Sequence, residues 1–430
     1  MKVGIRQKAL MEALEKGATA ATSDIAQTDT SNLALLIKSV KITADSKNLT
    51  IESGTNLMSV KYNVPVSDEN GIVVKEDGCI LVPAKELMNW IKVQGKESTI
   101  TMTLQKLATP EIINTLDGVS DSDEESKKFT IKKIGTVKIA SKDTAKTNAK
   151  WELDCYDPEE ISSISYTQKA EKNFEVKGSQ LIEGLGRVLF AALPSDFQQY
   201  LNGVSIQVHE KNLYFITTDL QRCALYKVPS ADVSNIESEK PLLIPATLLE
   251  QCSKIIDKED KLTFSYSEEL DKVYITQPNL KIRLVSSEKQ TIQKFPSVQN
   301  LLKKKYESLT ELPKNMLNSL LINAAVVNSS CALFSFSKDD KTLTVKAISE
   351  ANKYKPSVKQ SELGAISKDT RVVWGVSHIM DGLKVMKEDD VVIDMPENIK
   401  SARFSGKGNE SFIYFTMAPE NKLYSSDMAE

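Results

Sequence analysis

The sequence predicts an α+β protein of three similar domains, each with two helices packed on antiparallel sheets. Three observations predict this class. A short apolar run, a helical pattern and an alternating run follow one another three times along the 430 residues. Two further sets of apolar anchors keep the same order around each copy. The composition, with 41% hydrophobic and 26% charged residues, is that of a globular protein.

The central part of each copy joins a strand to a helix. The three copies read ILVPAKELMNWIKV (80–93), LLIPATLLEQCSKII (242–256) and VVWGVSHIMDGLKVM (372–386). Apolar residues spaced three and four apart predict amphipathic helices. Pro83 and Pro245 suit the first turn of a helix, where the missing N–H costs nothing. The runs STITMTL, KLTFSYS and DVVIDM that follow alternate in polarity, which predicts half-buried strands.

The flanking anchors define where each unit begins. KNLTIES (47–53), KNLYFIT (211–217) and KTLTVKA (341–347) predict matching strands. Pairs of apolar residues five apart mark a strand-to-helix transition at the start of each unit; these are Ile5 and Leu10, Val176 and Leu181, and Leu312 and Leu317. We therefore expect domains at 1–170, 171–303 and 304–430.

The first unit carries an insertion at about 105–140. It contains DGVSDSDEESKK, an acidic polar stretch that is typical of an exposed hairpin tip or loop. Asp117, Asp121, Asp123 and Glu125 also suggest a calcium loop. The spacing lacks the glycine and the final glutamate of an EF-hand, so we favour a solvated loop.

Several classes of function lack their usual signals. The five cysteines form no CxxC pair and the chain has two histidines, so free thiols in a reducing cytoplasm are expected, with no metal and no cofactor. No apolar run of membrane-spanning length occurs, and the amino terminus has no signal-peptide pattern. The net charge is −3, so a nucleic-acid partner requires positive charge gathered on one surface.

A family resemblance rests on an ordered set of motifs. YLNGVSIQVHEKNLYFITTDLQRCALYKV (200–228), KFPSVQNLL (294–302) and FIYFTMAP (412–419) resemble segments of the bacterial DNA polymerase III beta subunit, the DNA sliding clamp. The resemblance implies the DNA clamp fold, in which two chains close into a homodimeric ring. It also implies a cytoplasmic processivity factor in DNA replication that is not an enzyme and has double-stranded DNA, bound without sequence preference, the replicative polymerase and the clamp loader as partners.

The expected DNA-binding residues come from two arguments. The charges of the predicted helices point to Arg6, Lys85, Lys92 and Lys254. The resemblance adds Ser195, Gln199 and Tyr200, in the loop before the YLNG strand, and supports Lys85. Only Tyr200 is typical of the family in that loop, and the stretch from Ala21 to Leu33 has no arginine.

The resemblance also implies a hydrophobic cleft that receives short peptides of partner proteins. Carried over residue by residue, the cleft comprises Leu201, Thr218, Leu220, Gln221, Arg222, Cys223, Pro296, Leu301, Ile399, Ser401, Phe415, Thr416 and Met417, with Ala418 and Pro419 near its rim. Leu220 and Gln221 stand where the family has Gly-His, and Cys223 where it has leucine, so a somewhat different peptide is expected.

Two alternatives stay open. One is an adaptor or structural protein with the clamp fold that does not retain DNA. The other is a metal-dependent nucleic-acid enzyme, in which Asp219 and Asp257 would bind Mg²⁺. No Walker A, GxGxxG, HExxH or GxSxG motif is present, and Asp219 fits a turn-capping role better.

Overall fold

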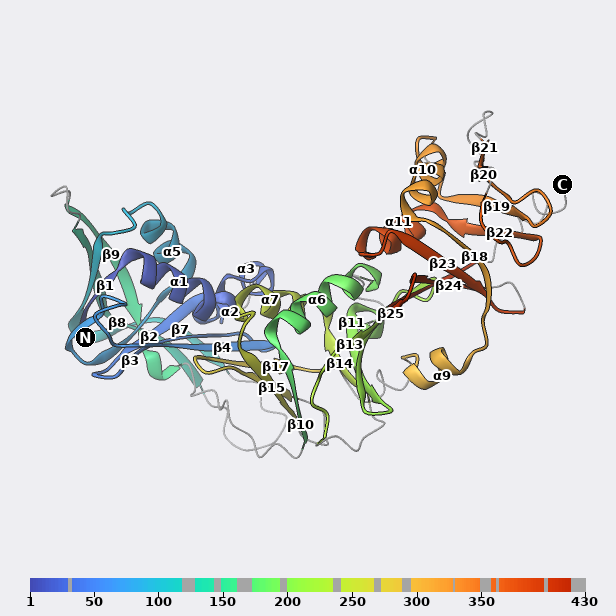
Figure 1. Ribbon diagram of the computed structural model, residues 1–430. Coiled ribbons are helices and arrows are strands. Elements are labelled where there is room, and N and C mark those ends of the chain that lie inside the picture. Colours follow the sequence, from blue (N-terminus) through green and yellow to red (C-terminus); the bar gives the residue numbers. More distant parts are fainter. Residues whose placement is uncertain are drawn as a thin grey trace. The chain divides into compact units, whose positions relative to one another are not determined.

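The computed structural model divides the chain into two compact units (Figure 1). Unit 1 comprises Met1–Asn173 with Gln251–Val285, and unit 2 comprises Phe174–Glu250 with Ser286–Glu430. None of the described helices is long and apolar enough to cross a membrane. The structure describes residues 1–29, 33–117, 128–142, 148–160, 172–193, 199–234, 241–266, 272–287, 295–327, 329–348, 357–360, 363–397 and 401–418.

The threefold strand–helix–strand repeat is confirmed. The central junctions are β6 (Gly78–Pro83) to α5 (Ala84–Lys92), β14 (Leu242–Pro245) to α7 (Ala246–Ile255), and β22 (Thr370–Gly375) to α11 (Val376–Val385). The following strands are β7 (Thr99–Asp117), β15 (Lys261–Tyr266) and β23 (Asp390–Met395). The opening junctions are β1 (Lys2–Arg6) to α1 (Gln7–Gly17), β10 (Lys172–Lys177) to α6 (Gly178–Val188), and β18 (Glu307–Pro313) to α10 (Lys314–Ala325). Pro83 is the residue before its helix rather than the first helical residue.

Unit 1 is built on one antiparallel sheet. Its strands run in the order β15–β16–β17–β4–β3–β2–β6–β9–β8–β7–β1–β5. The strands not yet introduced are β2 (Ser39–Ala44), β3 (Asn48–Gly54), β4 (Met58–Pro65), β5 (Val73–Glu76), β8 (Lys128–Lys142), β9 (Asn148–Tyr156), β16 (Lys272–Thr276) and β17 (Leu280–Val285). Helices α1 and α5 lie together on one face of this sheet (Figure 1), and Gln7 Nε2 joins them by donating to the backbone oxygen of Ile91 at 2.9 Å. Leu10, Leu14 and Leu87 of these helices are buried in the hydrophobic core that the helices form with the sheet.

Residues 251–285 join unit 1 through the pairing of β17 with β4. Leu280 faces Tyr62 in the antiparallel register, and the backbone N–H of Asn63 donates to the oxygen of Asn279 at 2.9 Å. Arg283 Nη2 donates to Ser59 Oγ at 2.9 Å. Alternate residues of β17 are buried, which fixes its register.

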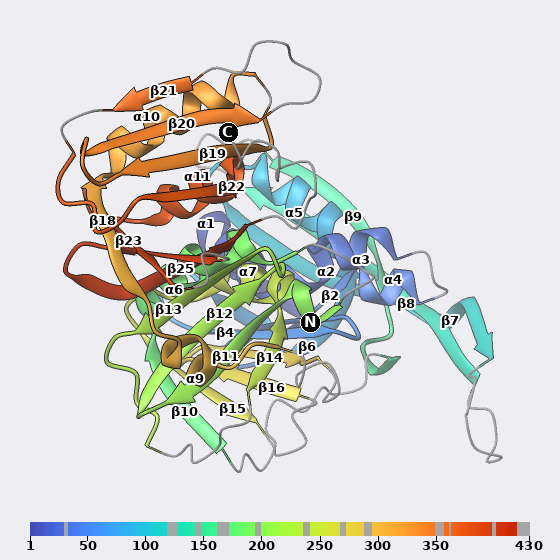
Figure 2. The ribbon, with the colours of Figure 1, turned by 90° about the vertical axis from the view of Figure 1, so that its right-hand side faces the viewer.

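The insertion at about 105–140 forms a long ribbon of β7 and β8. Figure 2 shows this ribbon projecting away from the rest of unit 1. Side chains 105–113 are all exposed, including those of Leu107, Ile112 and Ile113. The acidic stretch for which an exposed hairpin tip or loop is predicted, with most of the candidate calcium ligands, lies at 118–127 outside the described residues.

Unit 2 contains two antiparallel sheets. The larger runs β14–β11–β12–β13–β25–β24–β23–β18, and the smaller runs β21–β20–β19–β22. The new strands are β11 (Gly203–His209), β12 (Asn212–Thr218), β13 (Arg222–Val228), β19 (Cys331–Ser337), β20 (Thr342–Ile348), β21 (Ser357–Gln360), β24 (Ser401–Gly406) and β25 (Asn409–Met417).

Helices α6 and α11 pack on one face of the larger sheet, which we call the helix face, and glycine permits both contacts. A Cβ at Gly184 would lie 2.7 Å from Phe215 Cδ2, and one at Gly382 would lie 2.7 Å from Tyr414 Cδ1. The short helix α9 (Val298–Lys303) comes at the end of the second predicted domain, 171–303.

Candidate functional site

The turn between β12 and β13 is held by its own side chains. Asp219 Oδ1 accepts from the backbone N–H groups of Gln221 at 3.0 Å and Arg222 at 2.9 Å. Thr218 Oγ1 accepts from the N–H of Leu220 at 3.1 Å and donates to the oxygen of Arg222 at 2.6 Å. Asp219 therefore caps a turn, as the sequence indicated. Leu220, in the middle, has a φ of 72°, a left-handed conformation that is costly for a residue with a Cβ.

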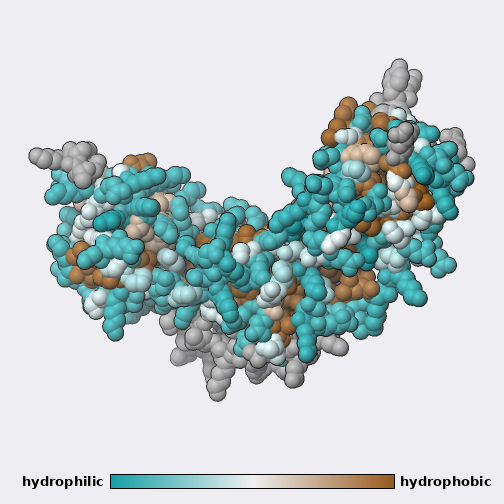
Figure 3. Space-filling view, viewed as in Figure 1, coloured by the Kyte–Doolittle hydropathy of each residue, from teal (hydrophilic) through white to brown (hydrophobic). Residues whose placement is uncertain are grey.

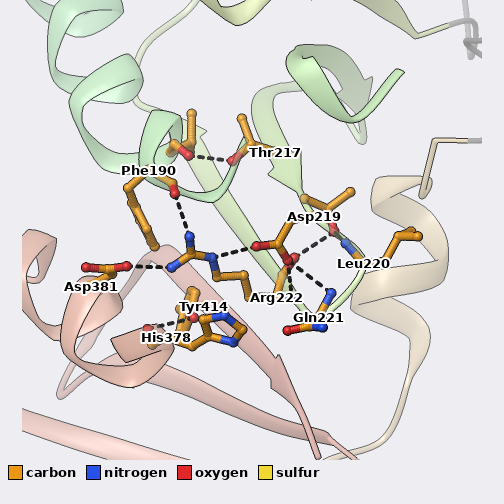
Figure 4. A network of polar contacts seen from close by, with 11 residues as sticks. Phe190, Thr217, Asp219, Leu220, Gln221, Arg222, His378, Asp381 and Tyr414 are labelled. Atoms are coloured by element: carbon orange, nitrogen blue, oxygen red, sulfur yellow. Dashed lines mark hydrogen bonds and ion pairs between the residues drawn. The ribbon is translucent and has the colours of Figure 1, made fainter. Parts of the chain in front are cut away.

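Arg222 lies at the centre of a polar network on the helix face (Figure 4). Its Nε donates to Asp219 Oδ2 at 2.9 Å, its Nη1 to Asp381 Oδ2 at 2.6 Å, and its Nη2 to the backbone oxygen of Phe190 at 3.0 Å. The guanidinium carbon also lies 5.5 Å from the centre of the Phe190 ring. All three nitrogens therefore serve the chain's own structure, and Arg222 ties the β12–β13 turn to helix α11.

Burial keeps the groups around this network uncharged. Burial lowers the pKa of His378, and the nearby positive charge of Arg222 lowers it further. Burial raises the pKa of Tyr414, whose hydroxyl donates to the backbone oxygen of His378 at 2.8 Å. The imidazole and the phenol are therefore neutral near pH 7, and neither adds a charge to the network.

The register of three strands brings most of the predicted cleft residues together. Arg222 faces Thr416 and Cys223 faces Phe415 where β13 pairs with β25. Ser401 faces Met417 where β24 pairs with β25. The backbone N–H of Met417 donates to the oxygen of Gln221 at 2.8 Å, so the end of β25 lies beside the β12–β13 turn.

Strand alternation places these residues on two different faces of the sheet. Phe215, Tyr226 and Tyr414 contact the helices at Gly184 and Gly382, so they mark the helix face. Counting by twos along each strand puts Arg222 and Thr416 on the helix face as well. The opposite face, which we call the outer face, carries Thr218, Cys223, Ser401, Phe415 and Met417. The cleft residues predicted from the sequence therefore lie on two opposite faces of the sheet.

A segment of chain crosses the outer face and includes the predicted Pro296 and Leu301. Gln207 holds its start, because Nε2 donates to the oxygen of Pro296 and Oε1 accepts from the N–H of Val298, both at 2.9 Å. At its end the Tyr306 ring lies 5.9 Å from the Phe415 ring, centre to centre. Lys304 Nζ donates to Ser401 Oγ at 2.9 Å. Pro296 and Leu301 are half-buried.

On the outer face, two partly exposed apolar side chains form what we call the rim, and buried side chains beneath them form the floor. Leu220 is 52% exposed and Met417 is 47% exposed. Cys223 and Phe415 are buried beneath, and burial raises the pKa of the Cys223 thiol to about 12. The thiol is therefore a neutral packing group at physiological pH. Leu201, also predicted for the cleft, is fully buried.

Some residues of this site carry signals too general to identify them from the sequence. Gln207 is the polar member of a buried strand, Tyr306 follows three lysines, and Asp381 stands in an amphipathic helix. A buried glutamine in a strand does indicate a specific hydrogen-bonding role, although not its partner. Lys304 and Asp381 required the structure, because their contacts are 97 and 159 positions away in the chain.

The basic residues predicted to bind DNA lie on two helices and at the end of one strand. Lys85 and Lys92 are exposed and seven residues apart on α5, so they share one side of that helix. The surface over α1 and α5 is mostly hydrophilic (Figure 3). Lys254, on α7, is also exposed. Arg6 is not helical as expected; it is the last residue of β1, and its Nη1 lies 3.5 Å from the backbone oxygen of Glu69.

Some predictions fall outside what the structure describes. Ser195, Ile399 and Pro419 lie outside the described residues. Gln199 and Tyr200 belong to a 3-10 turn at Gln199–Asn202, but their side chains are not described. The five cysteines are free, as predicted. The described residues contain no group of three or more His, Cys, Asp and Glu side chains that would hold a metal ion.

Comparisons with known proteins give one consistent likeness. The family profile described as DNA polymerase III beta subunit, central domain, matches residues 175–288. The "Beta sliding clamp" of Synechocystis sp. is 24% identical over 254 residues, which cover 55% of this chain and 62% of that protein. The "Beta sliding clamp" of Halalkalibacterium halodurans is 20% identical over 377 residues, 83% of this chain and 85% of that protein. The DNA polymerase III subunit beta from Pseudomonas aeruginosa has a TM-score of 0.75 at 15% identity, with 98% of this chain and 100% of that chain covered. This structural likeness establishes the DNA clamp fold.

Proposed function

We propose that the chain, which is similar to the bacterial DNA polymerase III beta subunit, is a DNA sliding clamp. Such a clamp is a processivity factor that encircles duplex DNA and tethers the replicative polymerase without catalysing a reaction. The observation that carries the proposal is the threefold repeat, whose order matches a beta subunit over 98% of this chain. A clamp acts by topology, so the chemistry of catalysis is not required of it.

We propose that the three predicted domains, 1–170, 171–303 and 304–430, each supply two helices to the lining of a homodimeric ring. Each of the six confirmed strand-to-helix junctions leads into one helix, which gives two helices for each predicted domain and supports this arrangement. A closed ring also pairs sheet edges that would otherwise be open. Light scattering is expected to give about twice the chain mass of 47.7 kDa. A monomer at micromolar concentration would contradict the ring.

The DNA side of the proposal rests on exposed basic side chains. Lys85 and Lys92 share one side of α5, and Lys254 is exposed on α7. Arg6, Ser195, Gln199 and Tyr200 complete the proposed contacts by family resemblance. Phosphate contacts of this kind are independent of sequence and weaken as salt rises. They suit a protein that must slide along DNA and must not stop at particular sequences.

The partner side of the proposal is a peptide cleft on the outer face of unit 2. The apolar rim of Leu220 and Met417 supports it, because neither side chain gains full burial in the chain itself. Leu220 also keeps a left-handed φ of 72° with its side chain half in water, so folding stability does not account for a leucine there. Burial of one partner leucine or phenylalanine contributes about 1.5–3 kcal/mol. We propose that the replicative polymerase and the clamp loader contain such peptides. They would bind the protein in the cytoplasm, where bacterial replication takes place.

The function is tested by retention on DNA. The protein is loaded onto a nicked circular plasmid with its clamp loader, and retained protein is measured by gel filtration before and after the plasmid is linearised. A clamp is retained on the circle and lost from the linear form. Replacing Lys85, Lys92 and Lys254 by glutamate is expected to reduce retention at low salt. The control makes the same change at three exposed lysines on the smaller sheet of unit 2 and the turn beside it, Lys338, Lys341 and Lys359. This control variant is expected to be retained as well as the unchanged protein. Equal retention on circular and linear DNA would contradict the clamp and favour an adaptor with the same fold.

A further inference from the structure

We propose that the outer-face cleft of unit 2 selects partner segments in which acidic residues stand beside the apolar anchor, and that Lys303, Lys304 and Lys305 recognise the acidic part. This inference rests on the proposed function, because it assigns the chemistry of the partner that the cleft receives. It concerns the sequence KKKY (303–306) at the end of α9.

Lys304, the middle one of the three lysines, lies at the edge of the apolar rim. Lys304 donates to Ser401 Oγ at 2.9 Å, and Ser401 is the strand partner of Met417. The ring of Tyr306, two residues on, packs at 46° to the ring of Phe415 in the floor of the cleft. All three lysines are exposed. A segment whose apolar side chain lies on Met417 therefore passes beside Lys304, and Lys303 and Lys305 are the chain neighbours of that residue.

Among the described residues, no carboxylate neutralises the positive charge of this cluster. Within the described residues, none of the three lysines forms an ion pair with a carboxylate. Arg403 provides the contrast: it flanks the same Tyr306 ring but is neutralised by Asp394 at 2.8 Å and lies 3.7 Å from Glu410. On the Arg403 side of the cleft the positive charge is therefore paired with carboxylates, whereas no described carboxylate pairs with the three lysines on the other side.

The surroundings favour a protein segment over nucleic acid as the occupant. Lys304 lies over the Tyr306 ring, 5.5 Å from its centre, on the face of the sheet opposite to helices α6 and α11. The neighbouring exposed side chains of Leu220 and Met417 match apolar side chains and offer nothing to a phosphate backbone. An apolar anchor gives the affinity of such a contact, and charges at the rim give selectivity and speed of association.

The test compares synthetic peptides that differ only in charge. Two fluorescent nine-residue peptides carry a Leu-Leu-Phe core with three aspartates either before or after it, and two counterparts carry asparagines. Affinities for the full-length protein are measured by anisotropy at 50 mM and 500 mM NaCl. We expect the better aspartate peptide to bind about tenfold more tightly than its asparagine counterpart at low salt, and the difference to shrink at high salt because rim charges are screened.

Variants assign the effect to the three lysines. Changing Lys303, Lys304 and Lys305 to glutamine is expected to remove the preference for aspartate while the asparagine peptides still bind. The matched control, glutamine at Lys338, Lys341 and Lys359, is expected to keep the preference. Circular dichroism melting checks that both triple variants are folded.

Three results overturn the inference while leaving the proposed cleft in place, and a fourth counts against the cleft itself. Equal binding of aspartate and asparagine peptides, with both lost in Met417→Ala, would leave the cleft in place and reject the acidic preference. A preference that survives the Lys303–Lys305 change would place the recognition elsewhere. Binding of a 12-nucleotide single strand that falls with the lysine change, while the peptides are unaffected, would assign the lysines to nucleic acid. Absence of binding by all four peptides, or binding that Met417→Ala leaves unchanged, would be this fourth result.

Discussion

Arg222 Nη1 lies 2.6 Å from Asp381 Oδ2, and this contact joins the turn that carries Leu220 to helix α11. The same guanidinium holds Asp219 within the turn at 2.9 Å. The side chain of Arg222 is 14% exposed and that of Asp381 is 46% exposed, so water screens the second ion pair in part. Arg222 is therefore a positioning residue that connects the outer rim with the helix face.

The Arg222–Asp381 contact is expected to couple the two positions energetically. Arg222→Gln and Asp381→Asn should each lower the melting temperature, and the double variant should lose less than the sum. We expect a coupling of about 1 kcal/mol, since one partner is half exposed. Additive losses in a thermal double-mutant cycle would show that the contact contributes no pairwise stability.

The close approach of α6 to the sheet predicts opposite effects for two neighbouring glycines. A methyl group at Gly184 would meet Phe215 at 2.7 Å, whereas nothing lies within 4 Å of one at Gly186. Gly184→Ala should destabilise unit 2 by about 1–3 kcal/mol through overpacking. Gly186→Ala should stabilise the helix by about 0.5–1 kcal/mol. Thermal melting of both variants checks the pair, and a loss at position 186 equal to that at 184 would contradict the packing described.

The left-handed backbone at Leu220 predicts a trade between stability and binding. Leu220→Gly should raise the unfolding free energy by about 1 kcal/mol, because glycine adopts a φ of 72° without a Cβ penalty. It should also weaken peptide binding, because the rim loses an apolar side chain. Leu220→Ala is the control: it keeps the Cβ and gains no stability, but it too weakens binding. Unchanged peptide affinity in both variants would remove Leu220 from the rim.

The buried position of His378 predicts a pH dependence of stability. Burial, and then the charge of Arg222, depress its pKa in the folded chain below the usual 6.5, while Asp219 and Asp381 oppose the shift. Between the folded pKa and 6.5 the unfolded chain binds more protons, so this contribution to stability is present above 6.5 and is lost as the pH falls below it. Thermal melting from pH 8 to pH 5 should show this loss, and His378→Gln should reduce it. An identical slope in the variant would assign the acid sensitivity to other groups.

The sequence predicted the repeated junctions well because each is a local pattern. Pro83 and Pro245 mark strand ends, and the 3–4 spacing after them is a property of about ten adjacent residues. The division of the cleft residues between two faces was not predicted, although alternation places Arg222 and Cys223 on opposite sides of β13. Knowing which side faces the helices required Gly184 and Gly382, whose contacts lie in other elements. The role of Arg222 could not be predicted because Asp381 is 159 positions away.

The pairing of β17 with β4 has a consequence for how the chain is made. Arg283 and Ser59 touch across this pair, although 224 positions separate them. At ribosomal speeds of about 5–20 residues per second, the hydrogen-bonding edge of β4 waits about 10–45 s for its partner strand to emerge. During that interval the nascent chain exposes an open strand edge, the feature on which intermolecular pairing begins. Synthesis of this protein at high levels is therefore expected to depend on chaperones that shield the first 65 residues until β17 has emerged.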